Sequence, residues 1–336
     1  MESSDASSFD PQRLSSRIDT SVAHPARRYN YFLGGRYNFA ADRESGDAVI
    51  AGYPTIRTAA RENRAFQRRA VTFLTEEAGV RQFLDIGAGL PAAPNTHEVA
   101  QRLAPESRVV YVDNDPLVAV YAGELLTSGP EVGVTDYVEA DARTPETILE
   151  AATRTLDFGR PIVLMLLAVL HFISDDDDPY GIVARLVGAL APGSYLVLSQ
   201  ATSDLIPEKH LAEAAAGRFG PFWPRSREQI ARFFDGLELL PPGITSVVHW
   251  RADNEPQPRP TAAEASAYCA VARVPERWLV EAVAPGRVDG VAQRQQELAE
   301  QVVELPLLVG FEPGQQPAFV GEVALDDPVD QFDALR

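Results

Sequence analysis

The sequence predicts an α/β fold: a Rossmann-like, doubly wound and mostly parallel sheet with helices on both faces. Between residues 82 and 200, short apolar runs of strand length alternate with stretches of helical periodicity. A parallel pair of strands cannot be closed by a tight hairpin, so this alternation is typical of strands joined by crossover helices. With 336 residues, of which 45% are hydrophobic and 23% charged, the chain can also bury a full core.

The expected elements follow one another in a regular order. The first is an amphipathic helix over residues 58–78, where apolar residues recur at helical spacing. Five strands are expected next, at residues 82–86, 108–112, 134–139, 161–168 and 194–199. The helices between them are expected at residues 96–103, 116–126, 145–155 and 179–190. The pattern then predicts a helix at 227–234 and two edge strands, 244–250 and 267–272, which pair antiparallel across a polar loop that contains prolines.

The charge of the chain excludes several classes of partner. Its 48 acidic and 30 basic side chains leave a net charge of −18, which argues against nucleic acid and against an anionic membrane surface. Cys269 is the single cysteine, so neither an internal disulfide nor a cysteine metal cluster is expected. The polar start lacks the apolar segment of a signal peptide, and no apolar run reaches membrane-spanning length. A cytoplasmic protein is therefore expected.

The loop after the first expected strand carries the most informative pattern. Gly87-Ala88-Gly89 and Ala92 match the G-x-G-x-x-G/A turn that lets a cofactor approach the backbone. Asp85 precedes this turn, where its carboxylate would repel the pyrophosphate of a nicotinamide cofactor. S-adenosylmethionine, with a sulfonium and a free ammonium group, has the opposite electrostatic need. The alternative is that Asp85 only caps the turn and the glycines only bend the chain.

Acidic residues also follow the next two strands. Asp113 lies 24 residues beyond Gly89, close to the spacing that brings a carboxylate to a ribose diol, with Asn114 beside it. Asp141 and the backbone N–H of Ala142 follow the third strand, where they can meet an adenine ring. Asp115 is expected to start the next helix, with Pro116 at its first position. Each acid could by itself be a helix cap, but together they favour a cofactor site.

Six segments of the chain resemble the class I S-adenosylmethionine-dependent methyltransferases. More narrowly, they are similar to an actinobacterial family of S-adenosyl methyltransferases formerly catalogued as a domain of unknown function. The segments are HPARRYNYFLGGRYNFAADRE, ENRAFQRRAV, FLDIGAGLPAAPNTHEVA, VVYVDNDP, LLAVLHFISDDDDP and PFWPRSREQIARFFDGLELLPPGI. The resemblance covers about His24 to Arg273 and implies a seven-stranded sheet whose last strand is reversed. It does not supply the methyl acceptor.

The same resemblance implies roles for individual residues. The methionine moiety of the cofactor would lie at Asp85, Gly87 and Gly89, its ribose at Asp113, and its adenine at Asp141 and Ala142. Ala88, Asn114 and Leu167 complete the expected cofactor site.

Charge and composition divide the chain into four expected parts. Residues 1–22 are expected to be a disordered arm, 23–80 an N-terminal lid and helix segment, and 81–275 the methyltransferase domain. Residues 276–336 form an acidic extension with a local charge of −8, from twelve acids against four arginines. Three roles stay open for this extension, namely packing on the body, self-association as a homodimer, and covering the pocket.

The expected reaction is in-line methyl transfer to an oxygen or nitrogen of a small-molecule acceptor, with no metal required. His171, after the fourth strand, is the candidate general base, and the alternative is a packed core histidine. The motif Asn/Asp-Pro-Pro-Tyr is absent, which disfavours methylation of adenine or glutamine. The acidic run at residues 175–178 is interpreted as a helix cap rather than a metal site.

The front segment is expected to act as a lid that contacts the acceptor. The candidate acceptor or lid residues are Tyr31, Arg36, Tyr37, Asn38, Arg64 and, beyond the fifth strand, Trp223. The alternative is that the aromatic residues pack on the sheet and the arginines are solvated. Two other functions stay open: a non-catalytic S-adenosylmethionine-binding regulatory module and a nicotinamide-dependent oxidoreductase.

Overall fold

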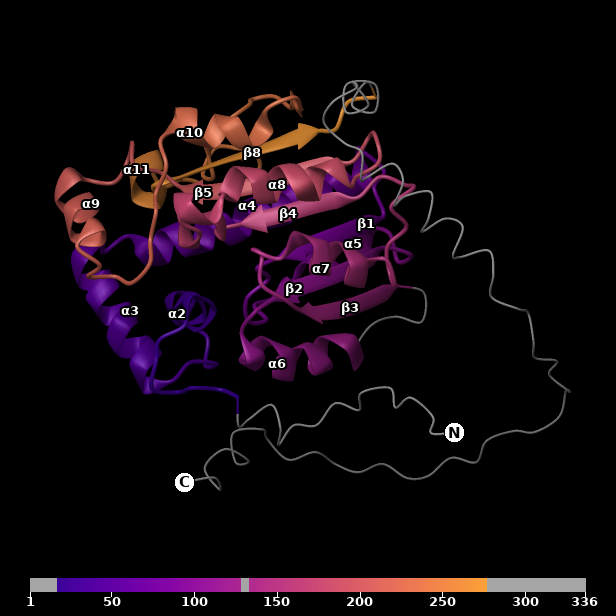
Figure 1. Cartoon of the computed structure of the whole chain (residues 1–336). Helices are drawn as coiled ribbons and strands as arrows, with labels where there is room; N and C mark the ends of the chain where they lie inside the picture. The colour runs from indigo at the N-terminus through magenta and orange to yellow at the C-terminus, as the bar shows by residue number, and fades with distance from the viewer. Residues whose placement is uncertain (1–16, 128–132, 277–336) are drawn as a thin grey trace, which may run out of the picture. The chain divides into compact units, whose positions relative to one another are not determined.

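A mixed sheet forms the centre of the molecule, and its strand order is β3-β2-β1-β4-β5-β8-β6, with β7 also paired to β8. The computed structural model describes residues 17–127 and 133–276, so most of the predicted acidic extension lies outside the described residues. β1 to β5 are mutually parallel, and β8 runs antiparallel to β5. The predicted doubly wound sheet with a reversed last strand is confirmed (Figure 1). The strands are β1 (Gln82–Ile86), β2 (Arg108–Asp113), β3 (Val134–Glu139), β4 (Val163–Leu167), β5 (Tyr195–Ala201), β6 (Glu238–Leu239), β7 (Thr245–Ser246) and β8 (Ala267–Arg273).

The helices begin close to the predicted positions, and several end earlier. The helix predicted over 145–155 stops at Ala152, and the one predicted over 179–190 stops at Gly188. The α-helices are α2 (Pro25–Phe32), α3 (Ala40–Gly52), α4 (Ile56–Glu76), α5 (Thr96–Leu103), α6 (Pro116–Thr127), α7 (Pro145–Ala152), α8 (Pro179–Gly188), α9 (Glu208–Ala215), α10 (Arg227–Ala231) and α11 (Ala262–Ala265). Short 3₁₀ turns occupy Leu170–Phe172, Asp175–Asp177 and Arg232–Phe234.

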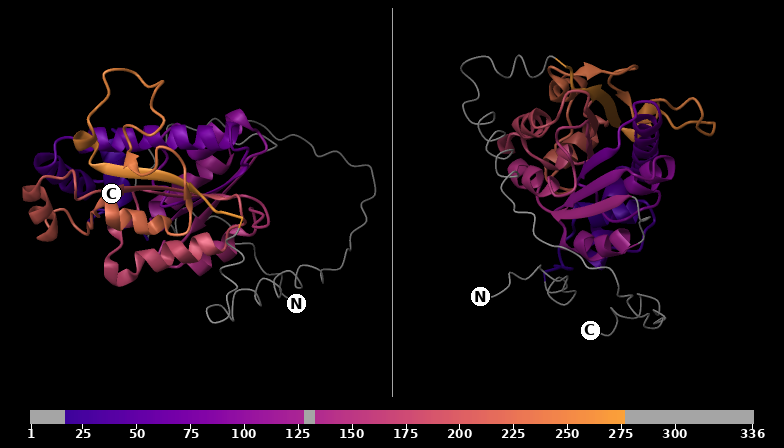
Figure 2. Two further views of the ribbon diagram at one scale, coloured as in Figure 1. Left: turned by 90° about the horizontal axis from the view of Figure 1, so that it is seen from above. Right: turned by 90° about the vertical axis from the view of Figure 1, so that its right-hand side faces the viewer.

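Both faces of the sheet are covered, because alternate strand residues point to opposite sides. Leu84 and Ile86 pack in one apolar cluster with side chains of α7 and α8. Phe83 packs in a second cluster with side chains of α4 and α5. The two helical layers lie on either side of the sheet when the molecule is seen from above (Figure 2). Asp85 therefore shares its face of β1 with Phe83, toward α5.

The strand predicted at 244–250 is wrong over most of its length. β7 covers Thr245–Ser246, and the chain then turns. The reason is Arg69 of α4, whose guanidinium donates to the carbonyl oxygens of Val247 and Trp250 at 2.6 and 2.8 Å. These carbonyls are thereby removed from any strand ladder. Because β6 and β7 each pair with a different part of β8, the described sheet has eight strands rather than seven.

The N-terminal segment forms the predicted helical layer, and a buried ion pair attaches it to the sheet. α2 begins at Pro25, and the His24 ring accepts a hydrogen bond from the Ala26 N–H. The Arg27 guanidinium makes two hydrogen bonds to the Asp115 carboxylate, at 2.8 and 2.7 Å. Asp115 also accepts from the Leu117 N–H, so it caps α6 as predicted. In the part of the chain that the structure describes, no helix has the length and apolar character needed to span a bilayer.

Candidate functional site

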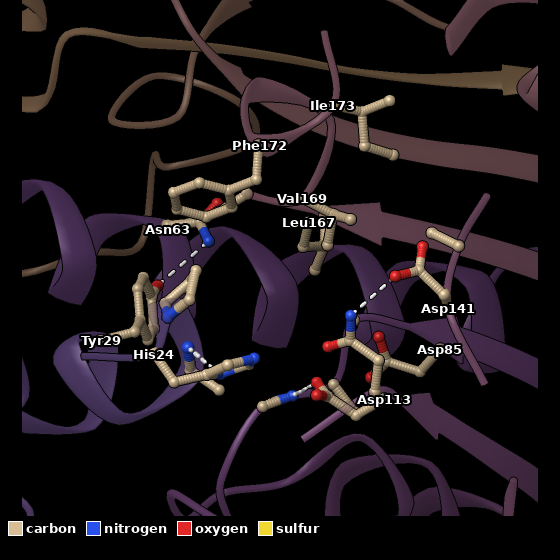
Figure 3. Close-up of a pocket in the computed structure, with 18 of the residues that line it drawn as sticks. His24, Tyr29, Asn63, Asp85, Asp113, Asp141, Leu167, Val169, Phe172 and Ile173 are labelled. Atoms are coloured by element: carbon tan, nitrogen blue, oxygen red, sulfur yellow. Dashed lines mark hydrogen bonds between the residues drawn. The ribbon is translucent and has the colours of Figure 1, made fainter. Parts of the chain in front are cut away.

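A cavity of about 300 Å³ opens at the carboxyl ends of β1, β2 and β3, under α2. We call it the acidic crevice, because Asp85, Asp113 and Asp141 all line it. Figure 3 shows these three carboxylates on one side of the cavity, with His24, Tyr29 and Asn63 on the other. The nine residues predicted to bind the cofactor all line this crevice, namely Asp85, Gly87, Ala88, Gly89, Asp113, Asn114, Asp141, Ala142 and Leu167.

The glycine turn brings the backbone to the edge of the crevice. Gly87 has a φ of +73°, and its N–H donates to the Val112 carbonyl of the neighbouring strand at 2.7 Å. A Cβ at this position would lie 2.1 Å from Cγ2 of Val169. Both the positive φ and the close approach of Val169 therefore require glycine here.

Asp113 is held rigidly by the same turn. One carboxylate oxygen accepts from the Gly89 N–H at 2.8 Å, and the other accepts from the Asp115 N–H at 3.0 Å. Burial raises the pKa of Asp113, and these two amides and the nearby His24 oppose that rise. Each carboxylate oxygen can accept a further hydrogen bond, and Asp113 lines the crevice, so it can accept from ligand hydroxyl groups.

Asp85 is a second buried carboxylate of the crevice with a raised pKa. It is 4% exposed, and its pKa is raised from 3.8 to about 6, chiefly by burial. The Thr96 hydroxyl at the start of α5 donates to it at 2.7 Å, and this bond and the charge of Arg64 limit the rise. A buried carboxylate with one modest donor favours a cationic ligand, which would supply the missing counter-charge.

Asp141 is already engaged in a polar network at the rim. It accepts from the side chains of Asn114 and Arg143, at 2.8 and 2.9 Å. Arg143 also pairs with Asp177 at 3.3 Å. The network orders the loop after β3 at the place where Asn114, Asp141 and Ala142 face the crevice together.

A second cavity, of about 150 Å³, adjoins the first. We call it the apolar pocket; its walls come from α2, α3, α4, the end of β5 and the segment around α9, and include the rings of Phe32, Phe219 and Phe222. Five residues line both cavities, namely Pro25, Tyr29, Asn63, Ala168 and Phe172. At this shared wall the Asn63 amide donates to the Tyr29 hydroxyl at 3.1 Å and accepts from the Ser199 hydroxyl at 2.6 Å.

His171, the predicted general base, lines the apolar pocket in a setting that opposes protonation. Its ring lies edge-on to Phe172 and Phe222. Burial, followed by the charges of Arg225 and Arg28, lowers its pKa from 6.5 to about 3. The Ala201 N–H approaches Nδ1 at 3.4 Å, which assigns the proton of the neutral ring to Nε2.

The predicted acceptor or lid residues are mostly placed elsewhere. Arg64 lines the acidic crevice and donates to the carbonyls of Ala92 and Pro94 in the glycine loop. The other five line neither cavity. Tyr31 donates to Asp47, the Tyr37 ring packs against Tyr121 at a tilt of 35°, and the Asn38 amide donates to Asn30. Arg36 is exposed, and Trp223 is 39% exposed.

Sequence reasoning missed His24, which precedes α2, Arg28 of α2, and Asn63 and Gln67 of α4. Asn63 lines both cavities, and His24 and Gln67 line the acidic crevice. Arg28 lines the apolar pocket. Pro25 indicated that a helix begins there. Which face of α2 lines the cavities, however, depends on how the helix packs against the rest of the fold.

The acidic run after β4 serves the fold, as predicted. Asp178 accepts from the Gly181 N–H at 3.0 Å and caps α8, and Asp175 pairs with the buried Arg225 at 2.7 Å. Within residues 17–127 and 133–276, no group of acidic, histidine or cysteine side chains is arranged to hold a metal ion.

Known proteins match this chain over most of its length. A family model described as S-adenosyl methyltransferase matches residues 11–275, a range that includes every residue lining the two cavities. A DUF574 family protein from Streptomyces avermitilis is 46% identical, with a TM-score of 0.72, over 77% of this chain and 100% of that one. A proposed methyltransferase from Thermobifida fusca is 39% identical, with a TM-score of 0.71, over 80% of this chain and 99% of that one. No curated protein matches this chain.

Proposed function

Because the chain belongs to the S-adenosyl methyltransferase family, we propose that it methylates an oxygen or nitrogen of a small-molecule acceptor by in-line transfer. The family assignment confirms the predicted resemblance, the methyltransferase class and S-adenosylmethionine as the cofactor. When bound, this cofactor supplies an electrophilic methyl group on a sulfonium.

The shared wall of the two cavities is the observation that carries the proposal. In-line transfer needs the acceptor atom to lie directly beside the methyl group, with water excluded from both. The acidic crevice and the apolar pocket meet at Tyr29, Asn63, Ala168 and Phe172. A cofactor in the crevice and an acceptor in the pocket would therefore face each other across this wall, under the cover of α2.

The charges of the acidic crevice match the polar groups of S-adenosylmethionine. Asp85 would accept from the ammonium group, and Arg64, whose charge acts on Asp85, would bind the neighbouring carboxylate. Asp113 would accept from the ribose hydroxyls. Asn114, Asp141 and Ala142 would face the adenine. The three acids disfavour a pyrophosphate, which weighs against a nicotinamide-dependent oxidoreductase.

We assign His171 to the wall of the acceptor site rather than to proton removal. A general base works best with a pKa near the operating pH, and the pKa of His171 is about 3. With Nδ1 facing the Ala201 N–H, the neutral ring carries its hydrogen-bond donor on Nε2, and His171 lines the pocket. His171 would then orient an acceptor oxygen without taking its proton.

The test of the cofactor site is calorimetric titration of the full chain with S-adenosylhomocysteine. Wild type should bind, and Asp113→Ala should lose about 10- to 100-fold in affinity, because two or more hydrogen bonds to a charged group are removed. The matched control is Asp253→Asn, since Asp253 is an exposed carboxylate that lines neither cavity. Wild-type protein that binds NADP and not S-adenosylhomocysteine would refute the proposal.

Catalysis is tested separately from binding. Incubation with S-adenosylmethionine and a panel of phenols, amines and carboxylic acids should yield S-adenosylhomocysteine and one methylated product in equal amounts. Tight cofactor binding with no turnover across the panel would favour the non-catalytic regulatory module instead. The apolar pocket beside the crevice is the feature that favours an enzyme, because a sensor needs no second cavity at the methyl group.

A further inference from the structure

The apolar pocket contains a buried cation without a carboxylate partner. Arg28 of α2 is 8% exposed and lines the pocket. Its Nη1 donates to the Phe219 carbonyl at 2.7 Å and to the Ser45 hydroxyl at 3.2 Å. Within the described residues, Nε and Nη2 of Arg28 make no hydrogen bond and no carboxylate pairs with the guanidinium.

Asp42 is the acid whose charge acts on Arg28, but its carboxylate is hydrogen-bonded to other groups. Its two carboxylate oxygens accept from the N–H groups of His24 and Phe39, at 2.9 and 2.8 Å. Burial lowers the pKa of Arg28, and Asp42 only partly offsets this effect. An isolated buried charge is costly, so its retention in a cavity points to a ligand that completes it.

The remaining lining of the pocket is consistent with an anionic, aromatic ligand. None of its described lining residues is an aspartate or glutamate. Phe32, Phe172, Phe219 and Phe222 supply ring faces and edges, and the Nε2–H of His171 is a further donor. A cavity of about 150 Å³ holds roughly one aromatic ring.

We propose that Arg28 binds the carboxylate of the methyl acceptor, and that the acceptor is a compound built on a single aromatic ring. The proposal rests on the proposed function, since it identifies the second substrate of the same site. The planar guanidinium would present Nε and Nη2 to the two carboxylate oxygens as a pair of parallel donors. Arg36, named from the sequence as a candidate acceptor or lid residue, lines neither cavity.

The experiment compares matched pairs of ligands on the full chain saturated with S-adenosylhomocysteine. The pairs are 4-hydroxybenzoate with 4-hydroxybenzamide, and 3-hydroxybenzoate with 3-hydroxybenzamide, which differ in charge but hardly in shape. Wild type should bind at least one carboxylate about tenfold or more tightly than its amide. Arg28→Gln should lose this preference and keep its affinity for S-adenosylhomocysteine. The matched control is Arg61→Gln, an exposed arginine of α4 that lines neither cavity, and it should keep the preference.

A direct readout covers the case in which Arg28→Gln does not fold. In ¹⁵N-labelled wild type, the Nε–H resonance of Arg28 should shift on addition of the benzoate and stay in place with the benzamide. Equal affinity within every pair, no binding by any of the four compounds, or a preference that survives in Arg28→Gln would overturn the proposal. If wild type did not bind S-adenosylhomocysteine at all, the proposed function itself would be overturned, so the two failures are distinguishable.

Discussion

The acidic crevice and the apolar pocket adjoin each other but balance charge in opposite ways. The crevice concentrates three carboxylates, Asp85, Asp113 and Asp141, and surrounds them with backbone amides and hydroxyl donors. The apolar pocket has no described carboxylate and contains the buried cation of Arg28. The difference indicates that one cavity suits a cationic, hydroxyl-rich ligand and the other an apolar ligand with an anionic end.

Two adjacent arginines on α2 illustrate the same contrast. Arg27 is buried and fully paired with Asp115, and it fastens the helix beside the crevice. Arg28 is buried, has no carboxylate partner within residues 17–127 and 133–276, and lines the pocket. Successive helical residues are about 100° apart, so the two neighbouring side chains point in different directions. One arginine therefore stabilises the fold, while the other is available to a ligand.

The largest effect is expected from breaking the Arg27–Asp115 ion pair, which holds α2 beside the crevice. Arg27→Met leaves the Asp115 carboxylate buried without its main partner, which should lower the free energy of unfolding by about 3 kcal/mol. Urea denaturation measures this loss. Arg17→Gln is the control, because its pair with Glu139 is solvent-exposed and should contribute far less to stability. Similar losses in both variants would show that Arg27 is not the main attachment.

The next largest effect is expected in the glycine turn of the crevice. Gly87→Ala places a Cβ against Val169 in a strained, positive-φ conformation and should weaken S-adenosylhomocysteine binding about 100-fold. Titration calorimetry measures the change. Gly188→Ala is the control, because a Cβ there meets nothing within 4 Å. Unchanged affinity in Gly87→Ala would mean that the turn does not approach the cofactor.

A change of pH is expected to have a smaller effect, and to alter only the binding of ligand in the acidic crevice. Asp85 has a pKa of about 6 without ligand, and a bound ammonium group favours its ionised form. Affinity for S-adenosylhomocysteine should therefore be full above pH 6 and fall as pH drops below it, by up to about tenfold per pH unit. Titrations between pH 5 and 8 test this slope.

Asp85→Asn is the matched variant for the pH experiment. It should bind the ligand weakly with a much flatter pH profile. It should also raise the stability of the ligand-free protein near pH 7 by up to about 3 kcal/mol, because burying the charged carboxylate is no longer required. If Asp85→Asn kept the same dependence of affinity on pH as wild type, the titrating group would be a residue other than Asp85.

The smallest effect is expected from His171 in the apolar pocket. Once an acceptor is known, His171→Ala should raise KM and lower kcat by less than about tenfold, since only one hydrogen bond is removed. The pH profile of kcat/KM between 5 and 8 should keep its shape, because a group with a pKa of about 3 does not titrate there. If His171→Ala lowered kcat/KM more than about 1000-fold, and an ionisation near neutral pH disappeared from the pH profile, His171 would be the general base after all.

The crevice could be predicted from the sequence because its residues lie at or just after the carboxyl ends of strands. In parallel sheets the carboxyl ends meet at one edge, so Asp85, Asp113 and Asp141 lie together once the strands are recognised. The roles of these residues toward the cofactor stay predictions. The apolar pocket could not be predicted, because its walls come from helices far apart in the chain, and the docking of α2 decides which side chains enter it.

The strand predicted at 244–250 failed for a similar reason. Its residues have strand character, but the buried guanidinium of Arg69 takes two of its carbonyls. Arg69 lies 178 residues earlier than Val247, so no local pattern reports this contact.

By itself, the sequence determined the doubly wound sheet and the group of residues at its carboxyl edge. These features depend on local periodicity and on the geometry shared by all parallel sheets. The tertiary structure alone decided that Tyr29 and Asn63 separate two cavities, that His171 is kept neutral, and that Arg28 is buried with no carboxylate partner among the described residues. Burial and charge pairing are set by segments distant in the chain, so they emerge only when those segments pack.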